Sequence, residues 1–471
     1  MSYKARDMVR SLRLAAALAL ILLASGASAE GLTEQQQFAR GIYQELVEIN
    51  TTTATGDTQK AAEAMGARLR AAGFPEGDVQ VFSPAPHKGN LVARLHGSGA
   101  RKPILLVAHI DVVPANREDW TVDPFKLTEQ DGYFYGRGSS DDKYMAASFV
   151  TNLIRYKKEG YKPDRDIIVA LETDEEIGDT NALGIQWLIK NHRDLIDAEF
   201  ALNEGGGVGL KNGKAIRNSV QTSEKISTAY QLTVTDRGGH SCCRARTTRS
   251  IASPKLVRLS KYDFPMNLNE TTRIYFAKTA ETESKQNADD IRAILAPQPD
   301  PAALARLSEI PGYNAQLRTT CVATMLHGGH AINALPQLAT AGVNCRILPG
   351  EPVEGVQAQI ERALADKRIE VKGGKATLSP PSPLNEEIMG SIEKLSKEFW
   401  PDAAVVPVMS TGATDGLFLR NAGIPTYGHS GLGADVDDNR NHGKDERVLV
   451  KSFYEGQEYL YRLVKMLAGG K

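Results

Sequence analysis

The sequence has few cysteines, almost no net charge and no long apolar run beyond residue 29. The formal charge is −1 over 471 residues, which is no electrostatic footprint for nucleic acid or for an anionic membrane surface. No CxxC or zinc-ribbon spacing occurs, so a cysteine-based structural zinc site is excluded. No internal repeat or low-complexity tract is evident. These absences favour an ordinary globular protein, and the length of 471 residues, with or without the first 29, suggests two or three domains and a large core.

One apolar stretch lies near the start of the chain. "MSYKARDMVRSLR" is basic, "LAAALALILLASG" is apolar, and "ASA" before Glu30 is typical of a cleavage site. The stretch is too short to span a membrane comfortably, and no cysteine follows it for lipid attachment. We therefore expect residues 1–29 to be a signal peptide that is cleaved near Ala29. The protein would be exported, to the periplasm or outside the cell, without a stable membrane anchor.

The four cysteines are Cys242, Cys243, Cys321 and Cys345. In an exported protein this even number permits disulfides. Adjacent cysteines can hardly bond to each other without strain, so we expect a bond from the Cys242–Cys243 pair to Cys321 or Cys345.

Apolar periodicity predicts alternating strands and helices after the leader. Continuous apolar runs at 90–95, 104–110, 166–173 and 198–204 predict buried strands, and amphipathic segments such as 142–160 and 182–192 predict helices. This alternation is typical of an α/β sheet covered on both faces. Polar residues just beyond the carboxyl ends of such strands converge on one crevice.

The middle of the chain predicts a second unit. "AYQLTVTDRGGHS" opens a strand-and-turn region, and a later strand, helix and final strand complete an open-faced α+β unit. Residues 296–317 within it predict an irregular or helical insertion. We expect a catalytic domain made of two segments, at 30–222 and 377–471, with an inserted lid domain at 223–376 between them.

Ionisable residues gather at the predicted strand ends and turns. His109 and Asp111 follow one strand, and a glycine-rich turn precedes Asp141. The remaining members are Glu175, Glu176, Glu204 and His442. Singly, each has an ordinary structural explanation as a solvated turn, a cap or a surface histidine. Carboxylates gathered at one sheet edge repel one another, however, and two divalent ions would neutralise them.

The pattern of motifs resembles the di-zinc exopeptidase family. HxD after a strand, GRGxxDDK, TDEE, a strand-end Glu and a late HGxDE occur in this order over nearly the whole chain after the leader. The family includes aminoacylases, glutamate carboxypeptidase, succinyl-diaminopimelate desuccinylase and carnosine-type dipeptidases. The resemblance implies a main α/β/α domain with a co-catalytic metal site, split by a smaller lid domain of the dimerisation type.

The resemblance also implies roles for the gathered residues. His109 and Glu204 would bind one zinc ion, His442 and Glu176 the other, and Asp141 would bridge them through a cis peptide to Asp142. Glu175 would be the general base, and Asp111 would orient His109. Manganese or cobalt are alternative metals.

Three lid residues complete the implied site. His240 would stabilise the developing oxyanion, across a dimer interface in some family members. Asn333 and Arg346 would bind a substrate carboxylate, for which arginine offers a bidentate fork. The resemblance thus leaves a homodimer through the lid open.

We expect an exported zinc metallopeptidase that hydrolyses an amide next to a free carboxylate, as a carboxypeptidase or dipeptidase does. The alternative substrate class is N-acyl amino acids. A third alternative is a non-catalytic protein that binds peptide or metal, although such a protein has no need for a base beside an intact ligand set.

Overall fold

The computed structural model describes residues 31–180, 183–243 and 253–470. The predicted signal peptide, residues 1–29, lies outside the described residues. None of the helices within the described ranges is long and apolar enough to cross a bilayer.

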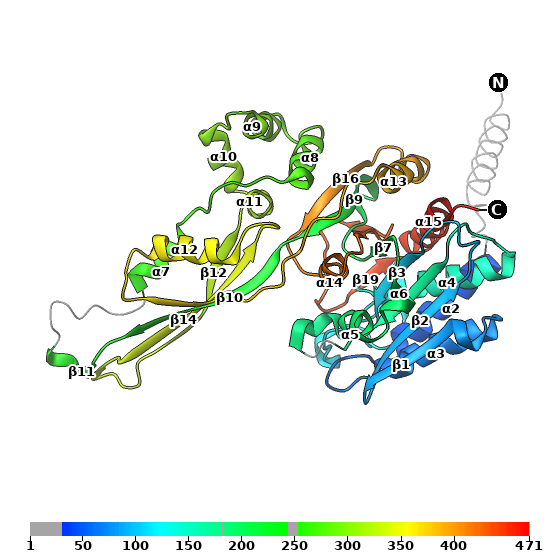
Figure 1. Cartoon of the computed structure of the whole chain (residues 1–471), viewed down its shortest axis with the longest axis horizontal. Coiled ribbons are helices and arrows are strands. Elements are labelled where there is room, and N and C mark those ends of the chain that lie inside the picture. The colour runs from blue at the N-terminus through cyan, green and yellow to red at the C-terminus, as the bar shows by residue number, and fades with distance from the viewer. Residues whose placement is uncertain (1–30, 181–182, 244–252, 471) are drawn as a thin grey trace, which may run out of the picture. The chain divides into compact units, whose positions relative to one another are not determined.

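The main sheet of the described chain has ten strands in the order β1-β2-β6-β3-β7-β17-β9-β8-β18, with β16 paired to β9 (Figure 1). Every residue of β3 and β6 is buried, as expected for strands covered on both faces. The predicted α/β main sheet is therefore confirmed. Its strands are β1 (Val79–Ala85), β2 (Lys88–Leu95), β3 (Ile104–His109), β6 (Ile167–Glu172), β7 (Phe200–Asn203), β8 (Val208–Lys211), β9 (Lys214–Glu224), β16 (Ala404–Ser410), β17 (Thr426–Gly428) and β18 (Gly433–Asp435).

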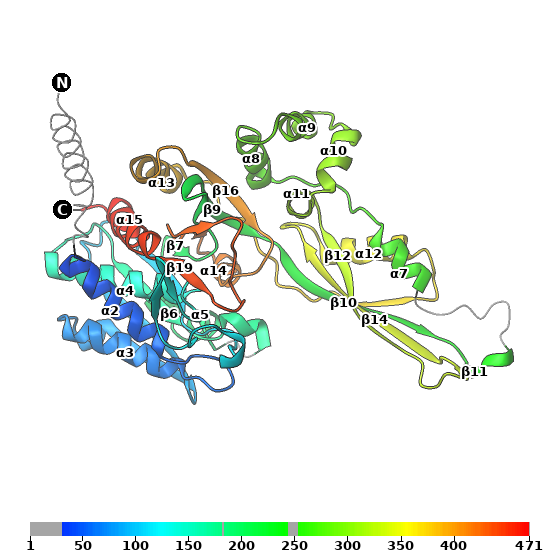
Figure 2. The same cartoon turned by 180° about the vertical axis from the view of Figure 1, so that it is seen from behind.

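Helices cover both faces of this sheet (Figures 1 and 2). On one face α5 (Ile185–Asn191), α6 (Arg193–Ile196) and α14 (Gly416–Asn421) share a buried core with β2, β3, β6 and β7. On the other face α4 (Lys143–Glu159) packs on β3 and β6 and contacts α3 (Thr58–Ala71) and α15 (Val450–Ala468). Helix α13 (Glu386–Phe399) packs against α15 and β16. Helix α2 (Glu34–Glu48) begins the described chain.

A small sheet joins segments from the two halves of the main domain. It contains β4 (Thr128–Gln130), β5 (Tyr133–Tyr135) and β19 (Arg447–Leu449), and β19 pairs with β5. The turn that follows β5 and the loop that precedes β19 are thereby held side by side. These two segments carry Asp141 and His442.

The lid forms a separate antiparallel sheet in the order β12-β14-β10-β15. Its strands are β10 (Ile226–Thr235), β12 (Thr320–Gly328), β14 (Leu338–Ile347) and β15 (Glu370–Gly373). Residues of β10 alternate between buried and exposed over most of its length, so one face packs on α7 (Ser253–Ser260) and α12 (Val353–Leu364). A two-stranded sheet of β11 (Gly239–His240) and β13 (Ala334–Leu335) extends beyond the far end of β10.

Four helices interrupt the lid. They are α8 (Glu270–Thr279), α9 (Lys285–Leu295), α10 (Pro301–Ser308) and α11 (Pro311–Leu317). They bury a core of their own around Phe276, Ile291 and Leu307. The insertion predicted at 296–317 is therefore helical through α10 and α11. The helices also reach the main domain, where the Gln316 side-chain amide donates to the carbonyl of Met409 at 2.9 Å.

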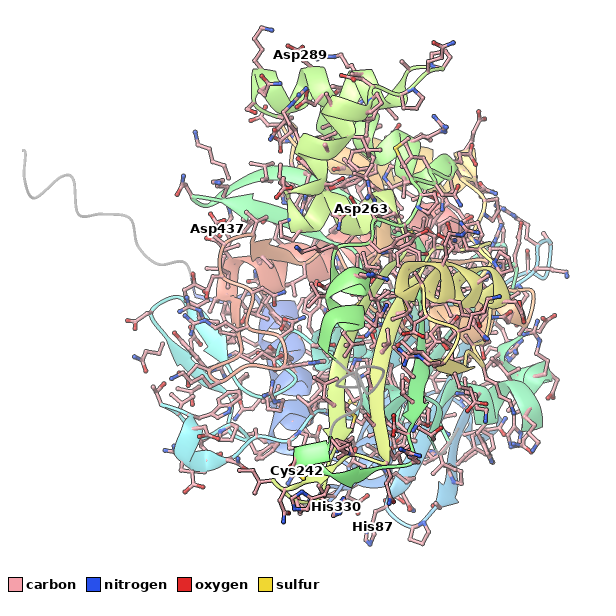
Figure 3. The ribbon with its side chains drawn as sticks, turned by 90° about the vertical axis from the view of Figure 1, so that its left-hand side faces the viewer. His87, Cys242, Asp263, Asp289, His330 and Asp437 are labelled. Atoms are coloured by element: carbon pink, nitrogen blue, oxygen red, sulfur yellow. A yellow bond between two sulfur atoms is a disulfide. The ribbon has the colours of Figure 1, made fainter. Side chains whose placement is uncertain are left out.

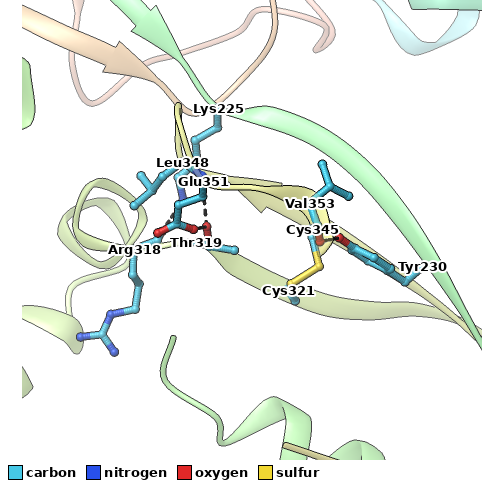
Figure 4. The surroundings of a disulfide bond; sticks show 9 residues. All are labelled: Lys225, Tyr230, Arg318, Thr319, Cys321, Cys345, Leu348, Glu351 and Val353. Carbon is cyan, nitrogen blue, oxygen red and sulfur yellow. Dashed lines mark hydrogen bonds between the residues drawn. A yellow bond between two sulfur atoms is a disulfide. The ribbon is translucent and has the colours of Figure 1, made fainter. Parts of the chain in front are cut away.

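A disulfide joins Cys321 of β12 to Cys345 of β14 (Figure 4). The two residues face each other in the β12–β14 ladder, with their Cα atoms 4.1 Å apart. The predicted bond from the Cys242–Cys243 pair is therefore wrong, because the ladder register makes Cys321 and Cys345 partners.

Replacing both cysteines of this disulfide by alanine is expected to lower the free energy of unfolding by about 3–4 kcal/mol. The bond spans 24 residues, and opening it restores the corresponding loop entropy to the unfolded chain. Urea unfolding of the variant and of the wild type, each with and without reductant, measures the effect. A loss below about 1 kcal/mol would contradict this expectation.

Candidate metal centre and active site

Three neighbouring parallel strands place the core of the candidate site. In the sheet order β6-β3-β7, β3 runs parallel to both neighbours, so their carboxyl ends share one edge. His109 ends β3, Glu175 and Glu176 follow β6, and Glu204 follows β7. The structure therefore brings these four side chains to one edge, as the sequence predicted.

Asp141 and His442 approach this edge from the segments joined by the small sheet. The Asp141–Asp142 peptide is cis, in agreement with the resemblance. Asp141 Oδ1 lies 3.0 Å from His109 Nε2, and its Oδ2 lies 3.3 Å from His442 Nε2. His442 Nε2 is also 3.0 Å from Glu176 Oε2. The two oxygens of Asp141 thus face two different imidazoles, which is the arrangement that a bridging carboxylate needs.

Asp111 positions the residues that follow β6. Its carboxylate oxygens accept hydrogen bonds from the backbone N–H groups of Glu175 at 3.3 Å and Glu176 at 3.2 Å. His109 Nδ1 bonds the backbone carbonyl of Asp111 at 3.0 Å and lies 3.6 Å from its carboxylate. Asp111 therefore fixes the turn that carries Glu175 and Glu176, in addition to orienting the ring of His109.

Burial and mutual repulsion dominate the electrostatics of the carboxylates. Burial, opposed in part by the charge of His109, raises the pKa of Glu176 to about 7. Burial and the charge of Asp141 raise the pKa of Glu204, and burial also raises the pKa of Glu175. Burial opposes ionisation of Asp141 too, but hydrogen bonds from His109 and His442 outweigh it and hold its pKa below the usual value.

The donor set fits two divalent cations. His109, Asp141 and Glu176 bring ligand atoms within 4.8 Å of one another, and so do His109, Glu175 and Glu204. Glu176 Oε1 is buried and has no hydrogen-bond partner among the described residues. Imidazole nitrogens with carboxylate oxygens suit zinc, and manganese and cobalt accept the same donors. Cations would also relieve the repulsion between these carboxylates.

A buried ion pair that the sequence did not predict holds the turn of Asp141. Arg137 Nη1 lies 2.6 Å from Glu446 Oε2, and both side chains are almost fully buried. Glu446 also accepts hydrogen bonds from the backbone N–H groups of Gly138 at 3.0 Å, Ser140 at 2.8 Å and Asp141 at 3.2 Å. The available signal was the final acid of "HGKDE". The sequence does not show that this carboxylate bonds the turn at 138–141.

Glu446→Ala is expected to lower the free energy of unfolding by about 3–5 kcal/mol, because it leaves the Arg137 guanidinium buried without its carboxylate. Urea unfolding measures this loss. Glu458→Ala is the matched control, since Glu458 pairs with Arg155 at the surface and its removal should cost about 1 kcal/mol or less. Equal effects of the two substitutions would contradict the role of Glu446.

The three lid residues predicted at the site lie at opposite ends of the lid sheet. His240 pairs with Ala334 in the β11–β13 sheet, and Ser241 N–H donates to the carbonyl of Asn333 at 2.9 Å. Cys242 and His330 mark this end in Figure 3. Arg346 faces Ser227 near the start of β10, eight strand residues or about 26 Å from this end. One carboxylate therefore cannot touch both Asn333 and Arg346 of a single chain.

Within the described residues, no hydrogen bond or ion pair joins His240, Asn333 or Arg346 to the carboxylate cluster. The structure thus brings the predicted metal ligands, Glu175 and Asp111 together, and leaves the three lid residues apart from them.

Two cavities adjoin the cluster. One, of about 320 Å³, is lined by Glu172, Glu175, Lys225 and Lys375 among others. The other, of about 630 Å³, is lined by Asp141, Asp142 and Glu204 and by Tyr275 and Gln316 of the inserted helices. The loop after β16 contributes to both cavities, through residues 413–415 in the first and Thr411 in the second. Members of the cluster thus line two cavities that have space for a ligand.

Comparison with known proteins agrees with this geometry. Human N-fatty-acyl-amino acid synthase/hydrolase PM20D1 is 30% identical over 381 residues, which cover 77% of this chain and 74% of that protein. Human aminoacylase-1 is 24% identical over 78% of this chain and 80% of its own. The M20 family metallo-carboxypeptidase Sso-CP2 from Sulfolobus solfataricus has the same fold, with a TM-score of 0.65 at 17% identity over 92% of this chain and 99% of its own.

A family model matches most of the chain as well. Residues 105–466 match the model of Peptidase family M20/M25/M40, and this range contains all the residues of the cluster. The chain therefore belongs to peptidase family M20/M25/M40 and is a metallo-hydrolase of peptide or amide bonds.

Proposed function

We propose that the protein hydrolyses N-acyl amino acids, at an amide bond whose leaving amine belongs to an amino acid with a free carboxylate. The observation that carries this proposal is Asp141 between two imidazoles, with Glu175 beside them at a cavity wall. This arrangement supplies a metal-binding cluster and a separate carboxylate for proton transfer.

His109 and Glu204 would hold one ion and His442 and Glu176 the other, with Asp141 shared between them. When bound, the two ions would supply the Lewis acidity that polarises the substrate carbonyl and lowers the pKa of water toward neutral pH. Zinc is the metal that we propose, because it accepts this mixture of nitrogen and oxygen donors.

The protein's own residues move the proton. Glu175 accepts a proton from the attacking water, and after the tetrahedral intermediate forms it donates that proton to the nitrogen of the leaving amine. Burial raises the pKa of Glu175, which brings it nearer to the value that a general base and acid needs. Asp111 holds the backbone of Glu175 by the hydrogen bond at 3.3 Å, so that its carboxylate stays beside the cluster.

The lid residues would complete the site in a dimer. His240 and Asn333 lie at the distal end of the lid sheet, whereas Arg346 lies near the strands that lead back to the main domain. We propose that a homodimer formed through the lid delivers His240 and Asn333 to the partner subunit's site. In that site His240 would contact the developing oxyanion. The substrate carboxylate would be bound by Arg346 of the subunit that provides the metal ligands.

The names of two relatives support N-acyl amino acids as the substrate class. PM20D1 is named as a synthase/hydrolase of N-fatty-acyl amino acids, the second relative is named an aminoacylase, and this chain covers 74% and 80% of their lengths. Dipeptides are the second candidate class, because they present the same amide next to a free carboxylate. A relative from Dictyostelium discoideum that is named carboxypeptidase S-like, 28% identical over 378 residues, supports peptide substrates in general.

Mass-spectrometric profiling of zinc-loaded protein against N-acyl amino acids, dipeptides and longer peptides tests the proposal. We expect cleavage of N-acyl amino acids first and of dipeptides more slowly. Preferential cleavage of dipeptides would move the protein to the second class. Zinc-loaded protein that is inert across the whole panel would instead favour the non-catalytic alternative.

We also propose that the protein is exported, on the basis of the leader sequence at residues 1–29. N-terminal sequencing of protein recovered from outside the cytoplasm should then begin at or near Glu30. An N-terminus that retains the leader would contradict export by cleavage.

A further inference from the structure

The 320 Å³ cavity has acidic and basic residues on different elements. Glu172 and Glu175 come from β6 and the turn after it, and Asp415 comes from the loop after β16. Lys225 and Lys375 come from the two segments that connect the lid to the main domain. Apolar side chains, including Ile185, Ile226 and Phe418, line the rest. Such a cavity suits a ligand with an amine at one place, a carboxylate at another and apolar atoms between.

Hydrogen bonds of the backbone fix the position of Lys375. Gly374 N–H donates to the carbonyl of Ala229 at 3.2 Å, and the Thr228 hydroxyl donates to the carbonyl of Lys375 at 3.3 Å. The segment that returns from β15 therefore lies against the start of β10. The side chain of Lys375 is exposed, and its ammonium group has no hydrogen bond or ion pair within the described ranges.

The other cations near this place are constrained differently. The Lys225 ammonium is buried and donates to the carbonyl of Arg318 at 2.7 Å, and burial lowers the pKa of Lys225 to about 7. Arg346 faces Ser227 across the β10–β14 ladder, so both side chains leave the same face of the sheet, and Ser227 lines the cavity. Lys375 therefore lines the cavity without a hydrogen bond or ion pair of its ammonium group among the described residues. It lies next to β10, which carries Ser227, the cross-strand partner of Arg346.

The position of Glu175, which transfers the proton, indicates which part of the substrate occupies this cavity. Glu175 lines it and must reach the nitrogen of the leaving amine. The leaving amino acid therefore lies in this cavity. Its carboxylate and its nitrogen are attached to the same α-carbon, so the carboxylate lies in the cavity too. The cationic side chains that line the cavity, Lys225 and Lys375, lie on the segments that connect the lid to the main domain, so this carboxylate is attracted toward those segments.

We propose that Lys375 binds the free carboxylate of the leaving amino acid, beside Arg346. This proposal rests on the proposed function, because it takes the leaving group to be an amino acid. Lys375 would then help the enzyme to discriminate an N-acyl amino acid from the corresponding amide, which lacks the charge.

The test compares N-acetyl-leucine with N-acetyl-leucinamide as ligands of the full-length, zinc-loaded protein. Binding is measured by calorimetry in a Glu175→Gln background, so that neither ligand is consumed. The variants are Lys375→Met and Lys375→Arg. Lys372→Met is the matched control, since Lys372 is an exposed lysine of β15 that pairs with Glu370 at 2.7 Å and does not line the cavity.

We expect Lys375→Met to reduce the preference for the acid over the amide by about tenfold or more, since a charge-assisted contact is lost. Lys375→Arg and Lys372→Met should keep the preference of the parent. An unchanged ratio of acid to amide binding in Lys375→Met would overturn the role of Lys375 and leave the proposed function intact. Zinc-loaded wild-type protein that is inert across the whole panel of N-acyl amino acids, dipeptides and longer peptides would contradict the proposed function instead.

Discussion

Replacing Glu175 by glutamine is expected to lower kcat by about 10²–10⁴-fold while the metal content stays unchanged. Glutamine keeps the size and the backbone hydrogen bond to Asp111 but cannot accept a proton from water. Steady-state hydrolysis of an N-acyl amino acid, together with elemental analysis of the same sample, measures both quantities.

The neighbouring residue provides the control for Glu175. Glu176 donates its own backbone N–H to the same Asp111 carboxylate, and its side-chain carboxylate faces His442 at 3.0 Å. Glu176→Gln is therefore expected to lose part of the metal together with activity. Ligand atoms of Glu175 also lie within 4.8 Å of those of His109 and Glu204, so loss of a metal equivalent in Glu175→Gln would show that Glu175 is a ligand and contradict its role as the base.

Asp141→Asn is expected to have the larger effect on metal binding. Its two carboxylate oxygens face His109 at 3.0 Å and His442 at 3.3 Å, so removing its charge weakens both ion sites at once. We expect bound metal to fall from two ions per chain to one or none, and activity to fall below that of Glu175→Gln. Elemental analysis after dialysis against a fixed zinc concentration measures the loss.

The control for Asp141 is an acidic residue outside the cluster. Asp437 is a surface residue, labelled in Figure 3, that lies 3.7 Å from Lys211. Asp437→Asn should keep both ions and full activity. If Asp141→Asn also retained two ions, Asp141 would not be the shared ligand.

The sequence predicted that these ionisable residues lie together, because apolar runs show where the strands of a parallel sheet end. His109, Glu175 and Glu204 follow three buried strands, and neighbouring parallel strands place their carboxyl ends at one edge. The position of His442 needed the resemblance, since no local pattern joins the loop before β19 to the turn after β5.

Long-range pairing set the limits of prediction. The Cys321–Cys345 bond follows from the register of β12 and β14, which the spacing of four cysteines does not reveal. The separation of Asn333 from Arg346 likewise depends on the length of the β10–β14 ladder. Glu446 was overlooked because its partners, Arg137 and the turn at 138–141, lie about three hundred residues away in the sequence.

The central claim is that the cluster of histidines and carboxylates binds two metal ions. Equilibrium dialysis of the purified wild-type chain against zinc, followed by elemental analysis, tests this claim most directly. We expect two zinc ions per chain and the appearance of amide hydrolysis as the second ion binds. Saturation at one ion, or full activity without any, would contradict it.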